Sequence, residues 1–165
     1  MYLILIIGHT GQGKTTLVKK IIEGKNQYVF DVNNEYKDLP LDYVIRPQMR
    51  NVNLIVEQFI KKCALLKNTN IIFEDATGFL RGKQSKEMAR LMVSKRHSEN
   101  NYIILFHSIN RVPPEVLEMA NYIFLFKTND NYEAVDNKFH NDKVNDAFLK
   151  LRNAKNYSFI KINMI

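Results

Sequence analysis

Short apolar runs alternate along the chain with longer segments in which apolar residues recur every three or four positions. The runs predict β-strands and the periodic segments predict amphipathic helices, because side chains alternate between faces in a strand and recur every 3.6 residues in a helix. Strands alternating with helices are typical of a parallel sheet covered on both faces. The predicted strands span residues 2–7, 28–32, 70–73, 102–106, 122–127 and 157–162, and the predicted helices span residues 14–23, 52–66, 84–97, 113–119 and 143–151.

Two segments interrupt this alternation. Residues 37–51 contain Pro40 and Pro47 and are predicted as a loop, because proline disfavours a continuing helix or central strand. A polar, Asn-rich segment without a predicted element begins at Thr128. Neither an internal repeat nor a low-complexity linker divides the sequence. Its 165 residues fit one core, so residues 1–165 are predicted to form one α/β domain.

The first predicted strand leads directly into a match to the Walker A pattern. The matching residues are Gly8, His9, Thr10, Gly11, Gln12, Gly13, Lys14 and Thr15, with Thr16 next in the following helix. Glycines allow the backbone to wrap around phosphates, so that N–H groups and the helix N-terminus face negative charge. The segment therefore predicts an ATP site in which Lys14 reaches the β- and γ-phosphates and the Thr15 hydroxyl binds Mg²⁺.

A pair of acidic residues ends the predicted strand at 70–73. Glu74 is predicted to hold Mg²⁺ through water, and Asp75 is predicted to polarise the attacking water as general base. The two roles stay interchangeable at this point, because the more usual order of such a pair is Asp and then Glu. A water-activating carboxylate serves hydrolysis rather than phosphoryl transfer to a substrate hydroxyl, so the pair favours an ATPase.

Further segments resemble the FtsK–HerA group of P-loop motors. At the end of the second predicted strand, Asp31, Glu35 and Tyr36 resemble the Asp-Pro-x-Gly-Glu-Tyr stretch of HerA-like proteins, with Val32 and Asn34 where the family often has Pro and Gly. A turn after a strand is the simpler interpretation of the asparagines.

The strand at 102–106 is similar to the sensor strand of the same group. There the strand ends in a polar residue, commonly Gln, which senses the γ-phosphate or its water. His107 or Ser108 takes this position here.

The resemblance also implies an arginine finger, a residue that reaches the nucleotide of a neighbouring subunit and stabilises charge on the γ-phosphate. Arg96, within Lys95-Arg96-His97, is the first candidate, and Arg81 is the second. Cations at a helix C-terminus are the simpler explanation of the first cluster.

For the fold, the resemblance implies an ASCE/RecA-like P-loop domain. Its mostly parallel sheet has the order 5-1-4-3-2, to which this chain adds a C-terminal strand. For function, the resemblance implies a homo-oligomeric ring that translocates DNA and hydrolyses ATP between subunits. The short length is most similar to viral genome-packaging ATPases, for which a capsid or portal protein is the expected docking partner. Lys83, Lys86 and Arg111 are available for DNA contact.

Charge and composition add modest constraints. The formal charge of +7 fits attraction to nucleic acid and fits solubility equally well. The single cysteine, Cys63, excludes an intramolecular disulfide and is predicted to be a buried thiol. The longest apolar run, Leu3 to Ile7, is too short for a membrane span. A basic signal region is absent, so a cytoplasmic or virion-associated location is predicted.

Two other functions remain open. One is a nucleotide-binding switch for assembly or morphogenesis that hydrolyses ATP little. The other is a nucleoside or nucleotide kinase, in which Arg81 and Arg90 would lie near a lid.

Overall fold

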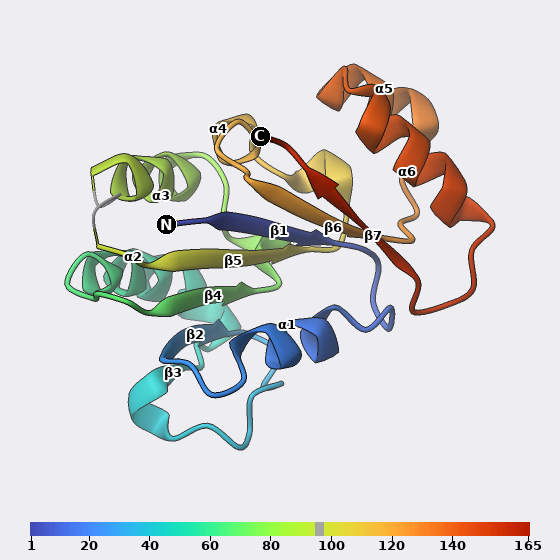
Figure 1. Ribbon diagram of the computed structural model, residues 1–165. Coiled ribbons are helices and arrows are strands. Elements are labelled where there is room, and N and C mark those ends of the chain that lie inside the picture. The colour runs from blue at the N-terminus through green and yellow to red at the C-terminus, as the bar shows by residue number, and fades with distance from the viewer. Residues whose placement is uncertain (95–97) are drawn as a thin grey trace.

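The computed structural model describes residues 1–94 and 98–165 and has one large sheet with helices on both of its faces (Figure 1). The strands of the described part are β1 (Leu3–Ile7), β2 (Gln27–Asp31), β3 (Val44–Ile45), β4 (Asn70–Glu74), β5 (Asn101–Phe106), β6 (Tyr122–Phe126) and β7 (Phe159–Asn163). The α-helices are α1 (Lys14–Ile22), α2 (Val52–Cys63), α3 (Lys83–Ser94), α4 (Pro114–Leu117), α5 (Tyr132–Phe139) and α6 (Asp142–Arg152). Single 3₁₀ turns are η1 (Leu41–Tyr43), η2 (Met49–Asn51), η3 (Ala76–Gly78) and η4 (Ile109–Arg111).

The strand order is β3-β2-β4-β5-β1-β6-β7. All neighbouring pairs are parallel except β6 and β7, which pair antiparallel. The predicted five-strand order therefore occurs within the sheet, with the C-terminal strand added beside β6. The full order differs in detail because β3 extends the opposite edge. The carboxyl ends of β1, β4 and β5 meet at one edge of the sheet, where α/β folds bind their ligands.

Two apolar cores lie on the two faces of the sheet. In β1, Leu3, Leu5 and Ile7 face the core formed with α2, α3, α5 and α6, whereas Ile6 faces the core formed with α1. Since both faces are covered, the central strands are apolar at nearly every position. Figure 1 shows α1 alone on its side of the sheet and the other labelled helices on the opposite side.

Two predictions about irregular segments are wrong. Residues 37–51 are not a simple loop, because Val44 and Ile45 pair with Val29 and Phe30 as β3. The strand is only two residues long and lies between Pro40 and Pro47, so the sequence shows no alternating pattern that would predict it.

The polar segment after residue 127 contains α5. Its buried side is narrow, formed by Tyr132, Val135 and Phe139 at helical spacing. The Asn131 side chain caps its N-terminus by accepting a hydrogen bond from the Glu133 N–H.

Other observations concern single elements. Helix α2 ends at Cys63 rather than at residue 66, and the Cys63 side chain is buried as predicted. In the part of the chain that the structure describes, no helix is both long and apolar enough to cross a membrane.

Candidate active site

The predicted phosphate loop connects β1 to α1 at the carboxyl edge of the sheet. Gly11 and Gly13 have φ values of +80° and +89°, a conformation that favours glycine. Gly13 is the N-cap residue of α1 and provides no side chain to its first amides. These amides, together with the positive end of the helix dipole, are therefore available to bind an anion. The loop therefore has the backbone geometry of an anion site.

Gly8 is glycine for a different reason. A Cβ atom placed on it would lie 2.5 Å from the Cβ of Phe126 in β6. The Gly8 N–H donates to the Phe106 carbonyl at 3.0 Å, and the His9 N–H donates to the Lys127 carbonyl at 3.0 Å. The first glycine of the loop thus allows the loop to pass close to β6.

Replacing Gly8 with alanine is expected to lower the free energy of unfolding by about 1–3 kcal/mol, because the backbone of the loop or of β6 must move. Urea denaturation measures this loss. Gly78→Ala is the matched control, because a Cβ at Gly78 meets nothing within 4 Å. Equal stability of the two variants would contradict the close approach at Gly8.

Lys14 is buried at the base of the loop, with 6% of its surface exposed. Its Nζ donates to the His9 carbonyl at 3.2 Å and lies 3.3 Å from His107 Nδ1. Burial lowers the pKa of Lys14, although the carboxylates of Glu74 and Asp75 oppose the shift. The Lys14 ammonium group therefore lies between the His9 carbonyl of the phosphate loop and the His107 ring.

Thr15 and Glu74, the two residues predicted to bind Mg²⁺, are in direct contact. The Thr15 hydroxyl donates to Glu74 Oε1 at 3.0 Å, and the Tyr36 hydroxyl donates to Glu74 Oε2 at 3.2 Å. Burial raises the pKa of Glu74 to about 7 despite these hydrogen bonds and Lys14. A hydroxyl and a carboxylate are oxygen ligands of the kind that Mg²⁺ binds together with substrate phosphates and water. The described residues contain no group of three or more His, Cys, Asp or Glu side chains that would hold a metal alone. The donor set therefore fits Mg²⁺ brought by a nucleotide.

Asp75 lies beside His107. Its backbone has a φ of +49°, and its Oδ1 lies 2.9 Å from His107 Nε2. Burial raises the pKa of Asp75, but the His107 imidazole, with Asn33 and Thr77, has the larger combined effect and holds this pKa below its usual value. The Thr77 hydroxyl also accepts a hydrogen bond from the His107 N–H at 3.0 Å. His107 is thus fixed between Asp75 and Lys14, with Nε2 facing the first and Nδ1 the second.

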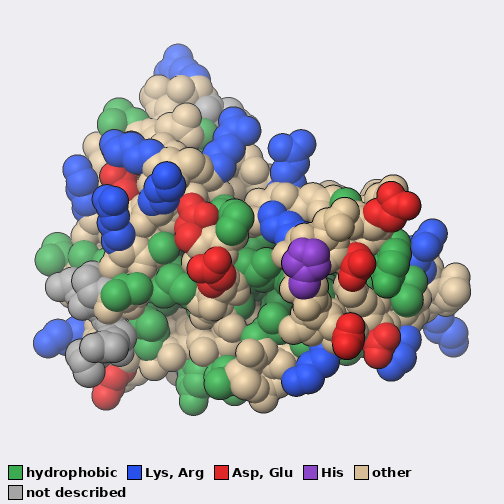
Figure 2. Space-filling view, turned by 90° about the horizontal axis from the view of Figure 1, so that it is seen from above, with side chains coloured by type: hydrophobic (Ala, Val, Ile, Leu, Met, Phe, Trp, Pro, Cys, Tyr) green, Lys and Arg blue, Asp and Glu red, His purple; other side chains and the backbone are tan. Residues whose placement is uncertain are grey.

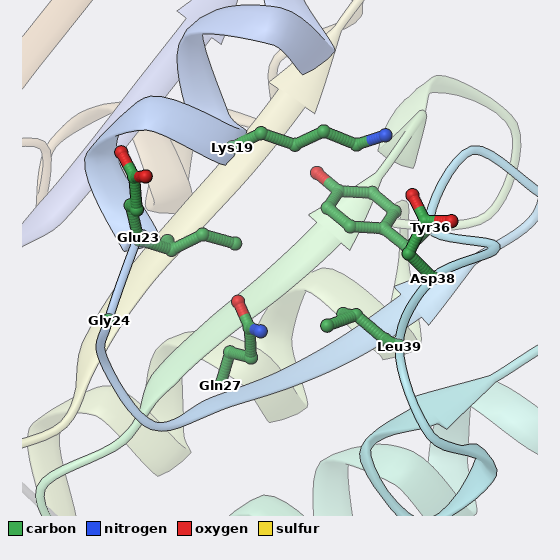
Figure 3. A pocket seen from close by; sticks show the side chains of 8 residues that line it. Lys19, Glu23, Gly24, Gln27, Tyr36, Asp38 and Leu39 are labelled. Atoms are coloured by element: carbon green, nitrogen blue, oxygen red, sulfur yellow. The ribbon is translucent and has the colours of Figure 1, made fainter.

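The stretch Asp31-Glu35-Tyr36 is a turn built on one carboxylate. Asp31 accepts hydrogen bonds from the N–H groups of Glu35 at 2.9 Å and Tyr36 at 3.1 Å. Arg46 Nε lies 3.5 Å from the same carboxylate. The turn positions the Tyr36 hydroxyl to donate a hydrogen bond to Glu74. Figure 3 shows the Lys19 side chain of α1 extending toward the Tyr36 ring. Sequence reasoning found the stretch but missed Arg46, which has no motif signal.

One cavity of about 280 Å³ collects most of the predicted residues. Its lining includes the predicted Thr10, Gly11, Gly13, Lys14, Thr15, Thr16, Glu74 and His107, and also Asn33, Glu35 and Tyr157. Asp75 contacts this group through His107. Gln12 is buried, and its Oε1 accepts a long hydrogen bond from the Tyr157 N–H at 3.4 Å. Ser108, the alternative to His107, donates to Asp130 instead.

The basic residues predicted as arginine fingers or DNA contacts do not line the phosphate cavity in the described part of the chain. Arg96 lies outside the described residues. Arg81 lines a separate cavity of about 420 Å³ with Lys86 and Arg111. Lys83 forms ion pairs with Glu57 at 3.0 Å and Glu87 at 3.7 Å, so its charge is partly compensated. In the view from above, from the side of the sheet opposite α1, Lys and Arg side chains cluster in the upper-left part of the surface (Figure 2).

Strand order, phosphate loop and the position of the acid pair define a P-loop NTPase fold. Among solved structures, the chain is similar to B204, the DNA-packaging ATPase of Sulfolobus turreted icosahedral virus, with a TM-score of 0.78, 18% identity and coverage of 98% of this chain and 92% of that one. It is equally similar to the genome-packaging NTPase B204 of Sulfolobus turreted icosahedral virus 2 in complex with AMPPCP, with a TM-score of 0.78, 19% identity and the same coverage. EccC of Thermomonospora curvata (ATPases 2 and 3) gives a TM-score of 0.59 at 14% identity, over 81% of this chain and 31% of that one.

At these identities the similarity establishes the fold, and the predicted resemblance is confirmed at that level. No protein-family model matches the chain, and no curated protein is similar to it in sequence.

Proposed function

We propose that residues 1–165 form a single Mg²⁺-dependent ATPase domain that moves DNA in genome packaging. The observation that carries the ATPase proposal is the contact between Thr15 and Glu74 beside Lys14, within a cavity that His107 also lines. P-loop NTPases bind the metal with a loop hydroxyl and an acid from a neighbouring strand. The 3.0 Å contact supports the proposal, because it places a hydroxyl oxygen and a carboxylate oxygen next to each other at the phosphate loop.

Each side chain then has a defined part in hydrolysis. Lys14 and the loop amides bind the phosphates, while Thr15 and Glu74 would hold Mg²⁺, whose positive charge would offset the negative charge of the phosphates. Asp75 accepts the proton of the attacking water, and the His107 ring beside it orients the carboxylate and senses the γ-phosphate. The low pKa of Asp75 keeps it ionised near neutral pH, as a proton acceptor requires.

The DNA proposal is supported by the fold shared with the DNA-packaging ATPase and by the net charge of +7. Arg111 and Lys86, which line the cavity with Arg81, are the proposed DNA contacts. Arg96 is proposed as the finger that completes a neighbouring subunit's site in a ring. Such a ring docks on a capsid or portal protein and acts in the host cytoplasm or virion.

The test is ATP hydrolysis as a function of protein concentration, with and without DNA. A site shared between subunits makes the rate per subunit rise with concentration, and DNA that enters the ring raises it further. We expect Arg96→Ala to abolish this rise and Arg152→Ala, the control that removes an exposed arginine of α6, to preserve it. A rate per subunit that is independent of DNA, of concentration and of Arg96 would leave an ATPase or switch but contradict the motor.

A further inference from the structure

A second cavity lies directly beside the phosphate cavity. It has a volume of about 370 Å³ and lies between α1 and the edge formed by β6 and β7. Gly13, Thr16 and Tyr157 line both cavities. A ligand in the phosphate loop therefore passes Thr16 and Tyr157 on its way into this second space.

The second cavity is mainly apolar and aromatic. Leu17 of α1, Phe126 of β6 and Phe159 of β7 contribute side chains to its wall. The Phe126 and Phe159 rings are in contact, with centroids 5.2 Å apart. One wall of the cavity is therefore a pair of rings, next to the point where the phosphate loop enters α1.

Two of the aromatic residues are unusually exposed for their size. Tyr157 is 69% exposed and Phe159 is 43% exposed. Tyr157 also has a φ of +68°, in the left-handed region that is unfavourable for a residue with a side chain. A Cβ added at Gly13 would lie 3.4 Å from Tyr157 Cδ1, so the ring lies over the phosphate loop. Burial in the protein core does not account for this placement.

We propose that this cavity receives the base of the bound nucleotide, which stacks on Tyr157 and packs against Phe159. The proposal rests on the proposed nucleotide site and adds its base subsite. Loop amides cradle the α- and β-phosphates, so the ribose and base extend away from Lys14 and Glu74. Thr16 and Tyr157 lie where the two cavities join. Beyond them, the rings of Phe126 and Phe159 form an apolar wall against which a planar base can pack.

Stacking also determines the selectivity of such a subsite. Every base has a π-face, so stacking on an aromatic side chain tolerates different bases. We therefore expect ATP and GTP to bind with affinities within about tenfold of each other.

The experiment compares ATP with inorganic tripolyphosphate, which has no base, by calorimetric titration. Tyr157→Ala is expected to weaken ATP binding by about 5- to 100-fold, because this is the range that a stacked base contributes. Tripolyphosphate binding should not change. Tyr157→Phe keeps the ring and should retain ATP affinity. Tyr43→Ala, which removes an equally large exposed ring (52% exposed) outside both cavities, is the control.

A second readout uses the absence of tryptophan from the sequence. Tyr157→Trp provides a single indole, whose fluorescence ATP should change and tripolyphosphate should not. Unchanged ATP affinity in both Tyr157→Ala and Phe159→Ala would overturn the base subsite. Equal weakening of ATP and tripolyphosphate would overturn it too, because Tyr157 would then only support the loop. Failure of the wild type to bind tripolyphosphate would instead contradict the phosphate site itself.

Discussion

Replacing Lys14 with alanine is expected to reduce ATP hydrolysis by at least about 100-fold, the loss typical when a cation or donor that stabilises transition-state charge is removed. Lys14, the first residue of α1, is a buried cation that lines the cavity, with its Nζ 3.3 Å from His107 Nδ1. In the proposed site its ammonium moves onto the β- and γ-phosphates. Affinity for ATP and for tripolyphosphate should fall together, since both ligands present the same phosphates.

Phosphate release measured at saturating ATP and Mg²⁺ gives the rate, and titration gives the affinities. Lys61→Ala on the exposed surface of α2 removes the same charge far from the cavity and should leave both unchanged. Turnover of Lys14→Ala within tenfold of the wild type would remove this lysine from the mechanism.

Asp75→Asn is expected to reduce turnover by about 10²- to 10⁴-fold while ATP still binds, because the amide has nearly the same shape and cannot accept the proton of water. The geometry favours Asp75 over Glu74 for this role. Glu74 contacts Thr15, the predicted Mg²⁺ ligand, which suits a role at the metal, whereas Asp75 contacts His107, the predicted sensor of the γ-phosphate. Glu74→Gln should instead raise the Mg²⁺ concentration needed for half-maximal rate.

The two variants are compared by titrating Mg²⁺ at fixed ATP and measuring both rate and nucleotide binding. Asp146→Asn, an exposed carboxylate on α6, is the control for the loss of one charge. The opposite pattern, a large loss of rate in Glu74→Gln with normal Mg²⁺ dependence and an active Asp75→Asn, would reverse the two assignments.

The sequence predicted the sheet well because its central strands are long, apolar and placed next to specific motifs. β1 is buried on both faces, and its apolar run ends at the phosphate loop. The sequence therefore predicted both that this segment is a strand and that it leads into the phosphate site. β3 was missed because two residues give no periodicity, and α5 was missed because only one narrow side of it is apolar. In both cases tertiary contacts define an element for which the local signal is weak.

In the candidate site too, residues within sequence motifs were predicted and residues outside motifs were missed. Lys14, Thr15, Glu74 and His107 were predicted from motifs, and they meet because parallel strands bring their carboxyl ends to one edge. Tyr157, which lines the cavity, and Arg46, which pairs with Asp31, were missed because each belongs to a segment without a motif. The Tyr157 N–H contacts Gln12 across 145 positions of sequence, a relation that no local pattern reveals.

The central place of β1 also governs how the chain can fold during synthesis. Strand β1 pairs with β5 and β6, which follow it by about a hundred or more residues in the chain. The two hydrogen bonds that hold the start of the phosphate loop come from Phe106 and Lys127, so the loop cannot take its bound shape before those residues have been made. A nucleotide at the proposed site would therefore stabilise only a chain that already contains β5 and β6, and a shorter growing chain would have to keep the apolar β1 from aggregating without that ligand.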